Sequence, residues 1–256
     1  MKIICIGRNY AEHAKELGNE IPENPVIFMK PDTAVLKKGS DFYIPEFSND
    51  IHYELEVVLK ISKGGKYIQA ENADKYYDEI GLGIDFTARD LQSKLKEKGL
   101  PWELAKGFDG SAVLSDFYKK ENFDLKNLSF SLIKNKEKVQ DGNTSMMLFS
   151  PEKIIEFVSQ YFTLRVGDLI FTGTPKGVGK VEEHDILEAL VRNANHIVTI
   201  DALCEAVWGD NPFGYGNSLL AHIRRIREKI ELNPSKPKSL ITVKGLGYKI
   251  NVESRL

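Results

Sequence analysis

The sequence changes its pattern near residue 183, and this change is what most constrains the fold. Before it, short runs rich in β-branched and apolar residues end at glycine-containing turns, which is typical of strands. After it, apolar residues recur at helical spacing. With 256 residues, the chain is long enough for two ordinary domains. We therefore expect a body of mixed β and α structure over residues 1–188 and a smaller unit over residues 189–256.

The first segment predicts mostly strands with a few helices between them. Ser150 and Pro151 suit the N-cap and first position of a helix that ends near Tyr161. Gly99 and Pro101 should stop an earlier helix. The strands expected are 51–61, 79–86 and 169–172, and the helices expected are 88–98 and 151–161.

The second segment predicts three helices followed by a hairpin, which is a winged-helix pattern. The first helix should cover 186–191, and Thr199 should be the N-cap of the second, which ends near Trp208. A third helix is expected over 217–232, and two short strands over 240–243 and 248–252. From Leu190 onward ten Lys or Arg and six Asp or Glu give +4, whereas residues 1–189 carry −6. This asymmetry suggests two units with different partners, although differences of a few charges also arise by chance.

Composition indicates a soluble folded protein. Hydrophobic residues make up 42% and charged residues 28%, which disfavours disorder. No apolar run is long enough to span a bilayer, and the first seven residues read as a buried strand rather than a signal peptide. The two cysteines, Cys5 and Cys204, are too few and too far apart for a disulfide framework or a cysteine-based zinc site. We therefore expect a cytoplasmic protein that makes no contact with membranes.

Three carboxylates form a candidate metal site. Glu54 and Glu56 lie two apart on an expected strand, so both should leave the same face, and Asp85 ends a later strand. Carboxylates that converge repel one another unless a cation or protons offset the repulsion. Oxygen ligands without thiolate or imidazole suit Mg²⁺ or Mn²⁺. The alternative is a solvated strand face, where such pairs are common.

Two further patterns are candidate functional motifs. His13 and Glu16 are three apart on an expected helix, where a carboxylate can orient an imidazole, although a charged surface helix gives the same spacing. The glycine-rich run 172–179 lacks Walker spacing, and no Ser or Thr follows Lys180. It is better interpreted as a tight turn whose amides and hydroxyls could hold a carboxylate.

Six blocks carry a resemblance that is far more specific than any one pattern. They are CIGRNYAEH (5–13), FMKPDTA (28–34), HYELE (52–56), GIDFTARDLQ (83–92), GLPWELAK (99–106) and FTGTPKGVG (171–179). In this order they resemble the acylpyruvase and oxaloacetate decarboxylase branch of the fumarylacetoacetate hydrolase family, over residues 1 to about 188. The resemblance implies a β-roll fold, a homodimer and Mg²⁺- or Mn²⁺-dependent C–C cleavage of small 2-oxo acids.

The same resemblance implies roles for individual residues. It implies that Glu54, Glu56 and Asp85 bind the metal and that Lys106 stabilises the developing enolate. It implies that His13 and Glu16 form a base dyad on a lid helix. Four further residues are implied to contact the substrate or line the pocket: Arg8, Lys30, Gln92 and Thr174. A metal ion is a Lewis acid that can stabilise an enolate, and a lysine cation adds to that stabilisation. Hydrolysis also needs an activated water, whereas decarboxylation needs only the groups that stabilise the enolate.

Three blocks in the second segment resemble the winged-helix effector domain of OmpR/PhoB-type response regulators. They are VTIDALCEAVWG (198–209), AHIRRIREKI (221–230) and ITVKGLGYKI (241–250). The resemblance implies that the helix over 217–232 enters the major groove of duplex DNA, where Arg224, Arg225, Arg227 and Lys244 contact phosphates or base edges. A solvated cationic helix face is the alternative.

The two resemblances meet inside both domains. Residues 183–191 fall on a strand of the enzyme family and on a helix of the winged-helix family. The last strand of the β-roll and the N-terminal sheet of the winged helix are both expected to be missing. We therefore expect a natural or engineered fusion, in which the chain is a 2-oxo acid enzyme with a DNA-binding module. The alternative is a transcriptional regulator whose enzyme body is a sensor or inactive.

Overall fold

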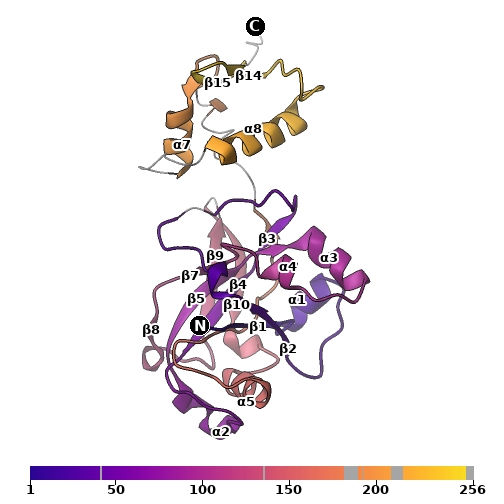
Figure 1. Ribbon diagram of the computed structural model, residues 1–256. Helices are drawn as coiled ribbons and strands as arrows, with labels where there is room; N and C mark the ends of the chain where they lie inside the picture. The colour runs from indigo at the N-terminus through magenta and orange to yellow at the C-terminus, as the bar shows by residue number, and fades with distance from the viewer. Residues whose placement is uncertain (41, 135, 182–189, 192, 209–215, 252–256) are drawn as a thin grey trace. The chain divides into compact units, whose positions relative to one another are not determined.

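The computed structural model describes residues 1–40, 42–134, 136–181, 190–191, 193–208 and 216–251. The chain divides into two compact units, Met1–Val181 and Glu182–Leu256 (Figure 1). The boundary expected at residue 188 and most of the helix expected over 186–191 lie outside the described residues; Leu190 and Val191 are helical. Among the described residues, no helix is both long and apolar enough to cross a membrane.

A seven-stranded sheet organises the first unit. Its strand order is β2-β1-β11-β4-β5-β7, with β8 paired to β5. β1 and β11 run parallel, and the other pairs are antiparallel. The strands are β1 (Ile3–Gly7), β2 (Val26–Lys30), β4 (Leu55–Ile61), β5 (Tyr77–Asp85), β7 (Ala112–Leu114), β8 (Tyr118–Lys119) and β11 (Leu169–Phe171).

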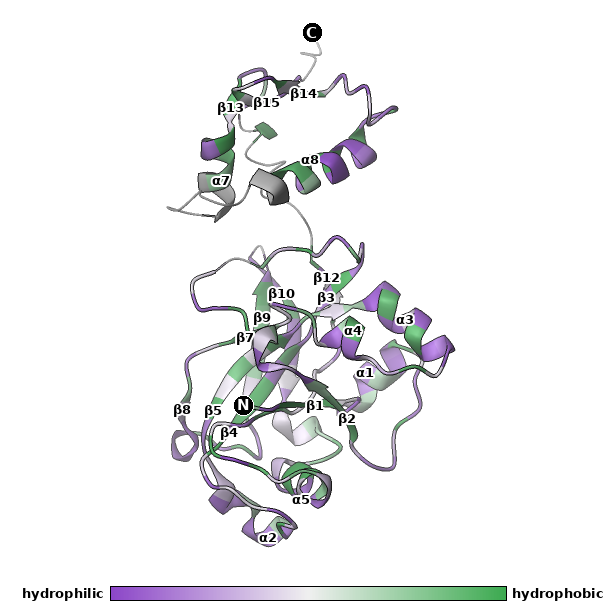
Figure 2. Ribbon diagram, in the orientation of Figure 1, coloured by the Kyte–Doolittle hydropathy of each residue, from purple (hydrophilic) through white to green (hydrophobic). Residues whose placement is uncertain are grey.

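Apolar side chains cover both faces of this sheet, because its central strands are apolar almost throughout (Figure 2). On one face, Ile4, Leu59 and Ile170 form a core cluster with Ile154 of helix α5 (Pro151–Tyr161). On the other face, Ile3, Cys5, Val58 and Phe171 form a second cluster with Phe28. The two clusters thereby keep water from both faces of the sheet, and buried polar groups gather where β4 begins and β5 ends.

The strand expected over 51–61 is in fact two strands that break at Glu54. β3 (Ile51–Tyr53) pairs with β6 (Thr87–Ala88) and β12 (Gly179–Lys180), whereas β4 belongs to the large sheet. The prediction of one continuous strand was wrong, because the two halves of an apolar run pair with different partners. A separate hairpin joins β9 (Ser129–Lys134) and β10 (Glu137–Asn143).

The helices of the first unit agree with the sequence at most boundaries. α5 begins as expected, with Ser150 as the N-cap whose hydroxyl accepts the amide proton of Lys153. The expected helix 88–98 is α3, and it ends before Gly99, which has a φ of +63°. The helices are α1 (Ala11–Glu16), α2 (Ala70–Ala73), α3 (Arg89–Glu97), α4 (Glu103–Lys106) and α5, with 3-10 turns η1 (Asp32–Ala34), η2 (Asp74–Tyr76), η3 (Lys120–Asn122) and η4 (Thr144–Met146).

In the part of the second unit that the structure describes, two helices accompany a three-stranded sheet, besides the helical residues Leu190 and Val191. β13 (Val198–Thr199), β15 (Gly247–Ile250) and β14 (Leu240–Val243) pair in that order, and the helices are α7 (Ile200–Trp208) and α8 (Gly216–Ile230). Thr199 caps α7 as expected, since its hydroxyl accepts the amide proton of Ala202 at 3.1 Å. The buried apolar residues that the structure describes in this unit are Leu190, Val198, Leu203, Cys204, Leu219, Ile223, Ile226, Leu240, Tyr248 and Ile250.

Candidate active site

Three buried carboxylates converge where β4 begins and β5 ends. Glu54, Glu56 and Asp85 are 5%, 2% and 0% exposed, and each offers an oxygen within 4.8 Å of the others. The break between β3 and β4 places Glu54 at the end of β5, where its carbonyl accepts the amide proton of Asp85 at 2.8 Å. Burial this deep excludes the solvated strand face that the spacing alone had left open.

Two buried lysines neutralise part of this negative charge. Lys106 Nζ lies 2.8 Å from Glu54 Oε2, 2.7 Å from Asp85 Oδ2 and 2.5 Å from the Thr87 hydroxyl. Lys30 Nζ lies 2.7 Å from the other Asp85 oxygen and donates to backbone and hydroxyl oxygens of Ser111. Asp85 therefore has a lysine on each oxygen. The two lysines come from different elements, the end of β2 and the end of α4.

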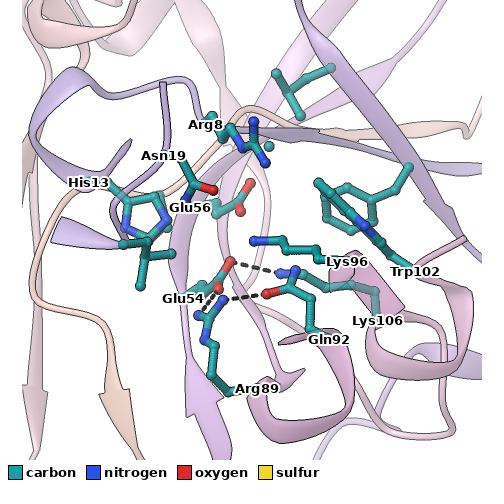
Figure 3. A pocket seen from close by; sticks show the side chains of 15 residues that line it. Arg8, His13, Asn19, Glu54, Glu56, Arg89, Gln92, Lys96, Trp102 and Lys106 are labelled. Carbon is teal, nitrogen blue, oxygen red and sulfur yellow. Dashed lines mark hydrogen bonds and ion pairs between the residues drawn. The ribbon is translucent and has the colours of Figure 1, made fainter. Parts of the chain in front are cut away.

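Arg89 is a site residue that the sequence reasoning missed. Its guanidinium pairs with Glu54 Oε1 and donates to Gln92 Oε1 at 2.6 Å, so it links the carboxylates to α3 (Figure 3). Arg89 and Gln92 are three apart and lie on one face of α3. The signal was present, because both residues stand in the block GIDFTARDLQ.

The carboxylates differ in how strongly they hold a proton. Burial raises the pKa of Glu54, but Lys106 and Arg89 outweigh it and hold that pKa well below its usual range. Burial, Asp85 and Glu54 together raise the pKa of Glu56 well above its usual range, against the Gly173 amide, which lowers it. Glu56 thus needs a proton or a further cation beside it.

The His13–Glu16 pair is formed as the spacing predicted. His13 Nδ1 lies 3.3 Å from Glu16 Oε2 on helix α1, and His13 is 5% exposed. The amide of Gly177 donates to Glu16 Oε1 at 3.1 Å, and Lys176 pairs with Glu12 at 2.8 Å. Burial lowers the pKa of His13, and the nearby Glu54 and Glu16 offset only part of that effect.

The glycine-rich run holds two carboxylates, as expected, and both belong to the protein itself. The Gly173 amide donates to Glu56 Oε2 at 2.6 Å, and that of Gly177 donates to Glu16. Gly173 has a φ of +101°, and a Cβ there would lie 2.6 Å from the Cβ of Asn9, so only glycine fits. Thr174 is buried, and its hydroxyl accepts a hydrogen bond from Gln140 at 2.9 Å.

One cavity brings most of these side chains together (Figure 3). Of the residues predicted from sequence, it is lined by Arg8, His13, Glu54, Glu56, Gln92, Lys106 and Thr174. Asp85 and Lys30 lie buried behind this lining, and Glu16 lies behind His13. Lining residues that the sequence reasoning missed include Asn19, Arg89, Lys96 and Trp102.

The cations predicted to contact DNA occupy different surroundings in the second unit. Arg224 is exposed and pairs with Glu228 at 3.1 Å, and Lys244 is exposed in the turn of the β14–β15 hairpin. Arg225 is half-buried. Arg227 instead turns toward the hairpin, where it donates to the Leu240 carbonyl at 3.0 Å and to the Thr242 hydroxyl at 2.8 Å and lies over the Tyr248 ring.

The chain belongs to the fumarylacetoacetate hydrolase family, because residues 2–205 match the family described as "Fumarylacetoacetate (FAA) hydrolase C-terminal". It is 44% identical to the mitochondrial oxaloacetate tautomerase FAHD1 of Bos taurus, over 73% of this chain and 85% of that protein. It is 42% identical to the mitochondrial oxaloacetate decarboxylase of Dictyostelium discoideum, over 73% and 87% respectively.

A solved structure shares the fold of the first unit. The fumarylpyruvate hydrolase from Pseudomonas aeruginosa, solved in complex with Mn²⁺ and pyruvate, superposes with a TM-score of 0.68 at 37% identity, over 71% of this chain and 81% of that one. Residues 178–250 also match "Transcriptional regulatory protein, C terminal". The two family matches overlap over 178–205, the region where the sequence pattern changes.

Proposed function

We propose that the first unit catalyses divalent-metal-dependent C–C cleavage of small 2-oxo acids, as oxaloacetate decarboxylation, acylpyruvate hydrolysis or both. The observation that carries this proposal is the buried cluster of Glu54, Glu56 and Asp85 with Lys106 against it. The names of the relatives support the substrate class, since they include oxaloacetate decarboxylase and fumarylpyruvate hydrolase.

The donor set fits Mg²⁺ or Mn²⁺. Three carboxylate oxygens within 4.8 Å of one another are hard ligands. Burial, with Asp85 and Glu54 beside it, raises the pKa of Glu56, and a divalent cation would favour its charged form. Glu54, Glu56 and Asp85 would hold the ion. When bound, it would supply a Lewis acid that polarises the 2-oxo group and favours the negative charge left by C–C cleavage.

Lys106 supplies a fixed positive charge at the same place. Its ammonium is buried, and Asp85 and Glu54 raise its pKa against the lowering effect of burial, so it stays protonated at neutral pH. A preorganised cation stabilises an enolate without any rearrangement at the moment of reaction. Lys30 holds Asp85 from its other side and is a positioning residue.

His13 is the general base in the hydrolytic reaction. If Nδ1 carries the proton and donates it to Glu16, the other ring nitrogen, Nε2, keeps a lone pair that can accept a proton from water. The lowered pKa of His13 keeps the ring neutral near pH 7. Glu16, itself held by the Gly177 amide, orients the ring.

The direct test is turnover of oxaloacetate and of acetylpyruvate with Mn²⁺, before and after exhaustive chelation. The Glu54→Gln variant should lose activity, because a neutral amide cannot replace a charged ligand. Glu79→Gln on β5, whose carboxylate pairs with Lys60 away from the cavity, is the matched control. Turnover that survives chelation would overturn the proposal.

A second proposed function is duplex DNA binding by residues 189–256. The exposed Arg224 and Lys244 and the net charge of +4 support it. Such binding should weaken steeply with salt, because it releases counterions. Arg225 would add to these contacts, whereas Arg227 is engaged by the hairpin. One winged helix makes few phosphate contacts. We further propose that the enzyme unit forms a homodimer, which would bring two winged helices to the same DNA.

A mobility-shift titration of the intact chain at two salt concentrations tests this second function. We expect weak binding, on the order of micromolar or weaker, because the body carries −6 and repels DNA. The Arg224→Gln, Lys244→Gln double variant should bind more weakly still, and Lys63→Gln, Lys75→Gln in the enzyme unit is the charge-matched control. Tight sequence-specific binding would instead favour a working transcriptional regulator whose enzyme unit is a sensor.

A further inference from the structure

One wall of the cavity gathers two cations around a tryptophan. The guanidinium carbon of Arg8 lies 5.9 Å from the centre of the Trp102 ring, and Lys96 Nζ lies 5.3 Å from it. Arg8 follows β1, Lys96 stands near the end of α3, and Trp102 precedes α4. All three line the cavity that Glu54 and Glu56 also line, and Figure 3 shows Lys96 reaching into it beside Lys106.

These two cations differ from the others in the site. Lys30, Lys106 and Arg89 each pair with a carboxylate of the acidic cluster. Within the described ranges, the structure records no hydrogen bond or ion pair for Lys96 or Arg8, and Nε of Arg8 is buried without a partner. Burying a cation without a partner costs free energy, and an anion bound beside these two cations would offset that cost.

The backbone and the electrostatics both show that this arrangement is held at a cost. Arg8 has a φ of +60°, in the left-handed region that non-glycine residues rarely adopt. Burial, together with the nearby cations Arg8, Arg89 and Lys106, lowers the pKa of Lys96 to about 8. Like charges are thus brought together in a half-buried site, and an anionic group between them would relieve the repulsion.

We propose that Arg8 and Lys96, gathered around Trp102, bind the second carboxylate of a dicarboxylic 2-oxo acid. The assignment rests on the proposed function, which puts the 2-oxo acid end of the substrate at the acidic cluster. The substrate then spans the cavity from Glu54 and Glu56 to the Arg8–Lys96 wall. Dicarboxylic acids such as oxaloacetate become the preferred class, and acylpyruvates that end in a methyl group become poor substrates.

Kinetics on a matched pair of substrates test the assignment. The Lys96→Met variant keeps the length of the side chain but not its charge. Its KM for oxaloacetate should rise about tenfold or more, as expected for loss of a charged hydrogen-bond partner, with KM for acetylpyruvate changed by less than about threefold. Lys94→Met, an exposed lysine on the same helix, is the control and should leave both values unchanged. An equal effect on both substrates, or none, would overturn the proposal.

A binding measurement separates this inference from the activity. Calorimetry with the Mn²⁺-loaded protein should show 2-oxoglutarate binding more tightly than 2-oxovalerate, which has the same chain length but lacks the second carboxylate. Lys96→Met should remove that preference. A preference that depends on Lys96 in a protein without turnover would refute the proposed function and keep the subsite. Equal binding of the two acids, or binding of neither, would refute the subsite.

Discussion

Lys30 Nζ and Asp85 Oδ1 lie 2.7 Å apart, and both side chains are fully buried. Lys106 Nζ lies 2.7 Å from the other oxygen of the same carboxylate. Asp85 is therefore held between two cations that come from different parts of the chain. The two lysines therefore fix the orientation of the Asp85 carboxylate.

Removing Lys30 should destabilise the protein strongly. The Lys30→Met variant leaves Asp85 with one cation fewer in a buried site, which typically costs about 3–5 kcal/mol. The equally short Lys38–Asp116 pair is exposed and screened by water, so Lys38→Met should change the stability little. Urea unfolding of the two variants measures the difference. Similar losses of unfolding free energy in both variants would show that the buried Lys30–Asp85 pair contributes no more to stability than the exposed pair.

Removing the imidazole should separate the two reactions. His13→Ala should impair acetylpyruvate hydrolysis by about 10²-fold or more, the usual contribution of a general base, and oxaloacetate decarboxylation much less. Glu16→Gln should show the same pattern in weaker form, because it disturbs only the orientation of the ring. His52→Ala is the control, since His52 pairs with Asp50 and does not line the cavity. Equal losses of both activities would contradict the assigned role of His13.

The preference for dicarboxylic acids should fall as the pH rises through about 8. Burial and the cations Arg8, Arg89 and Lys106 lower the pKa of Lys96 to about 8, and only Glu54 opposes them. The ammonium form attracts a second carboxylate, and it is lost above that pKa. The ratio of kcat/KM for oxaloacetate to that for acetylpyruvate, measured from pH 7 to 9, should decline in the wild type and stay flat in Lys96→Met. A wild-type ratio independent of pH would exclude this role for Lys96.

Asp168 should stabilise the protein except in acid. Its buried carboxylate accepts the backbone amide protons of Lys2 and Arg165, each at 2.8 Å, and thus ties β1 to β11. Burial raises the pKa of Asp168, but these bonds and Lys2 lower it below the usual value. The stabilisation is therefore present above the ordinary pKa of aspartate and is lost as the pH falls through the lowered value.

The Asp168→Asn variant should accordingly lose about 1–3 kcal/mol of unfolding free energy at pH 7. The difference from wild type should shrink as the pH is lowered, because the wild-type carboxylate is then protonated too. Urea unfolding at several pH values measures this, with the exposed Asp78→Asn as control. A difference that stays constant into acid would mean that the charge of Asp168 is not what stabilises the sheet.

Local signals in the sequence predicted local structure well. Caps such as Ser150 and Thr199 and the turn at Gly99 gave the helix boundaries, because these depend on neighbouring backbone groups. The break at Glu54 was missed, because it depends on which distant strands pair with each half of the run. Long-range pairing leaves no mark in the spacing of apolar residues.

The same distinction applies to the site. Glu54, Glu56, Asp85 and Lys106 were found through ordered sequence blocks and are brought together by the fold. Lys96 was missed because a lysine on an amphipathic helix normally faces solvent. Arg227 was expected on DNA, but its partners Leu240 and Thr242 are hairpin residues far along the chain.

The bonds of Arg227 also decide how the second unit can be dissected. The guanidinium of this α8 residue uses a carbonyl and a hydroxyl of β14. If α8 were grafted onto another scaffold without the hairpin, Arg227 would lose these two hydrogen bonds and its guanidinium would be exposed. The smallest fragment that keeps the surroundings of Arg227 therefore includes the β14–β15 hairpin. DNA-binding tests on the isolated helix would measure a surface that differs from that of the intact unit.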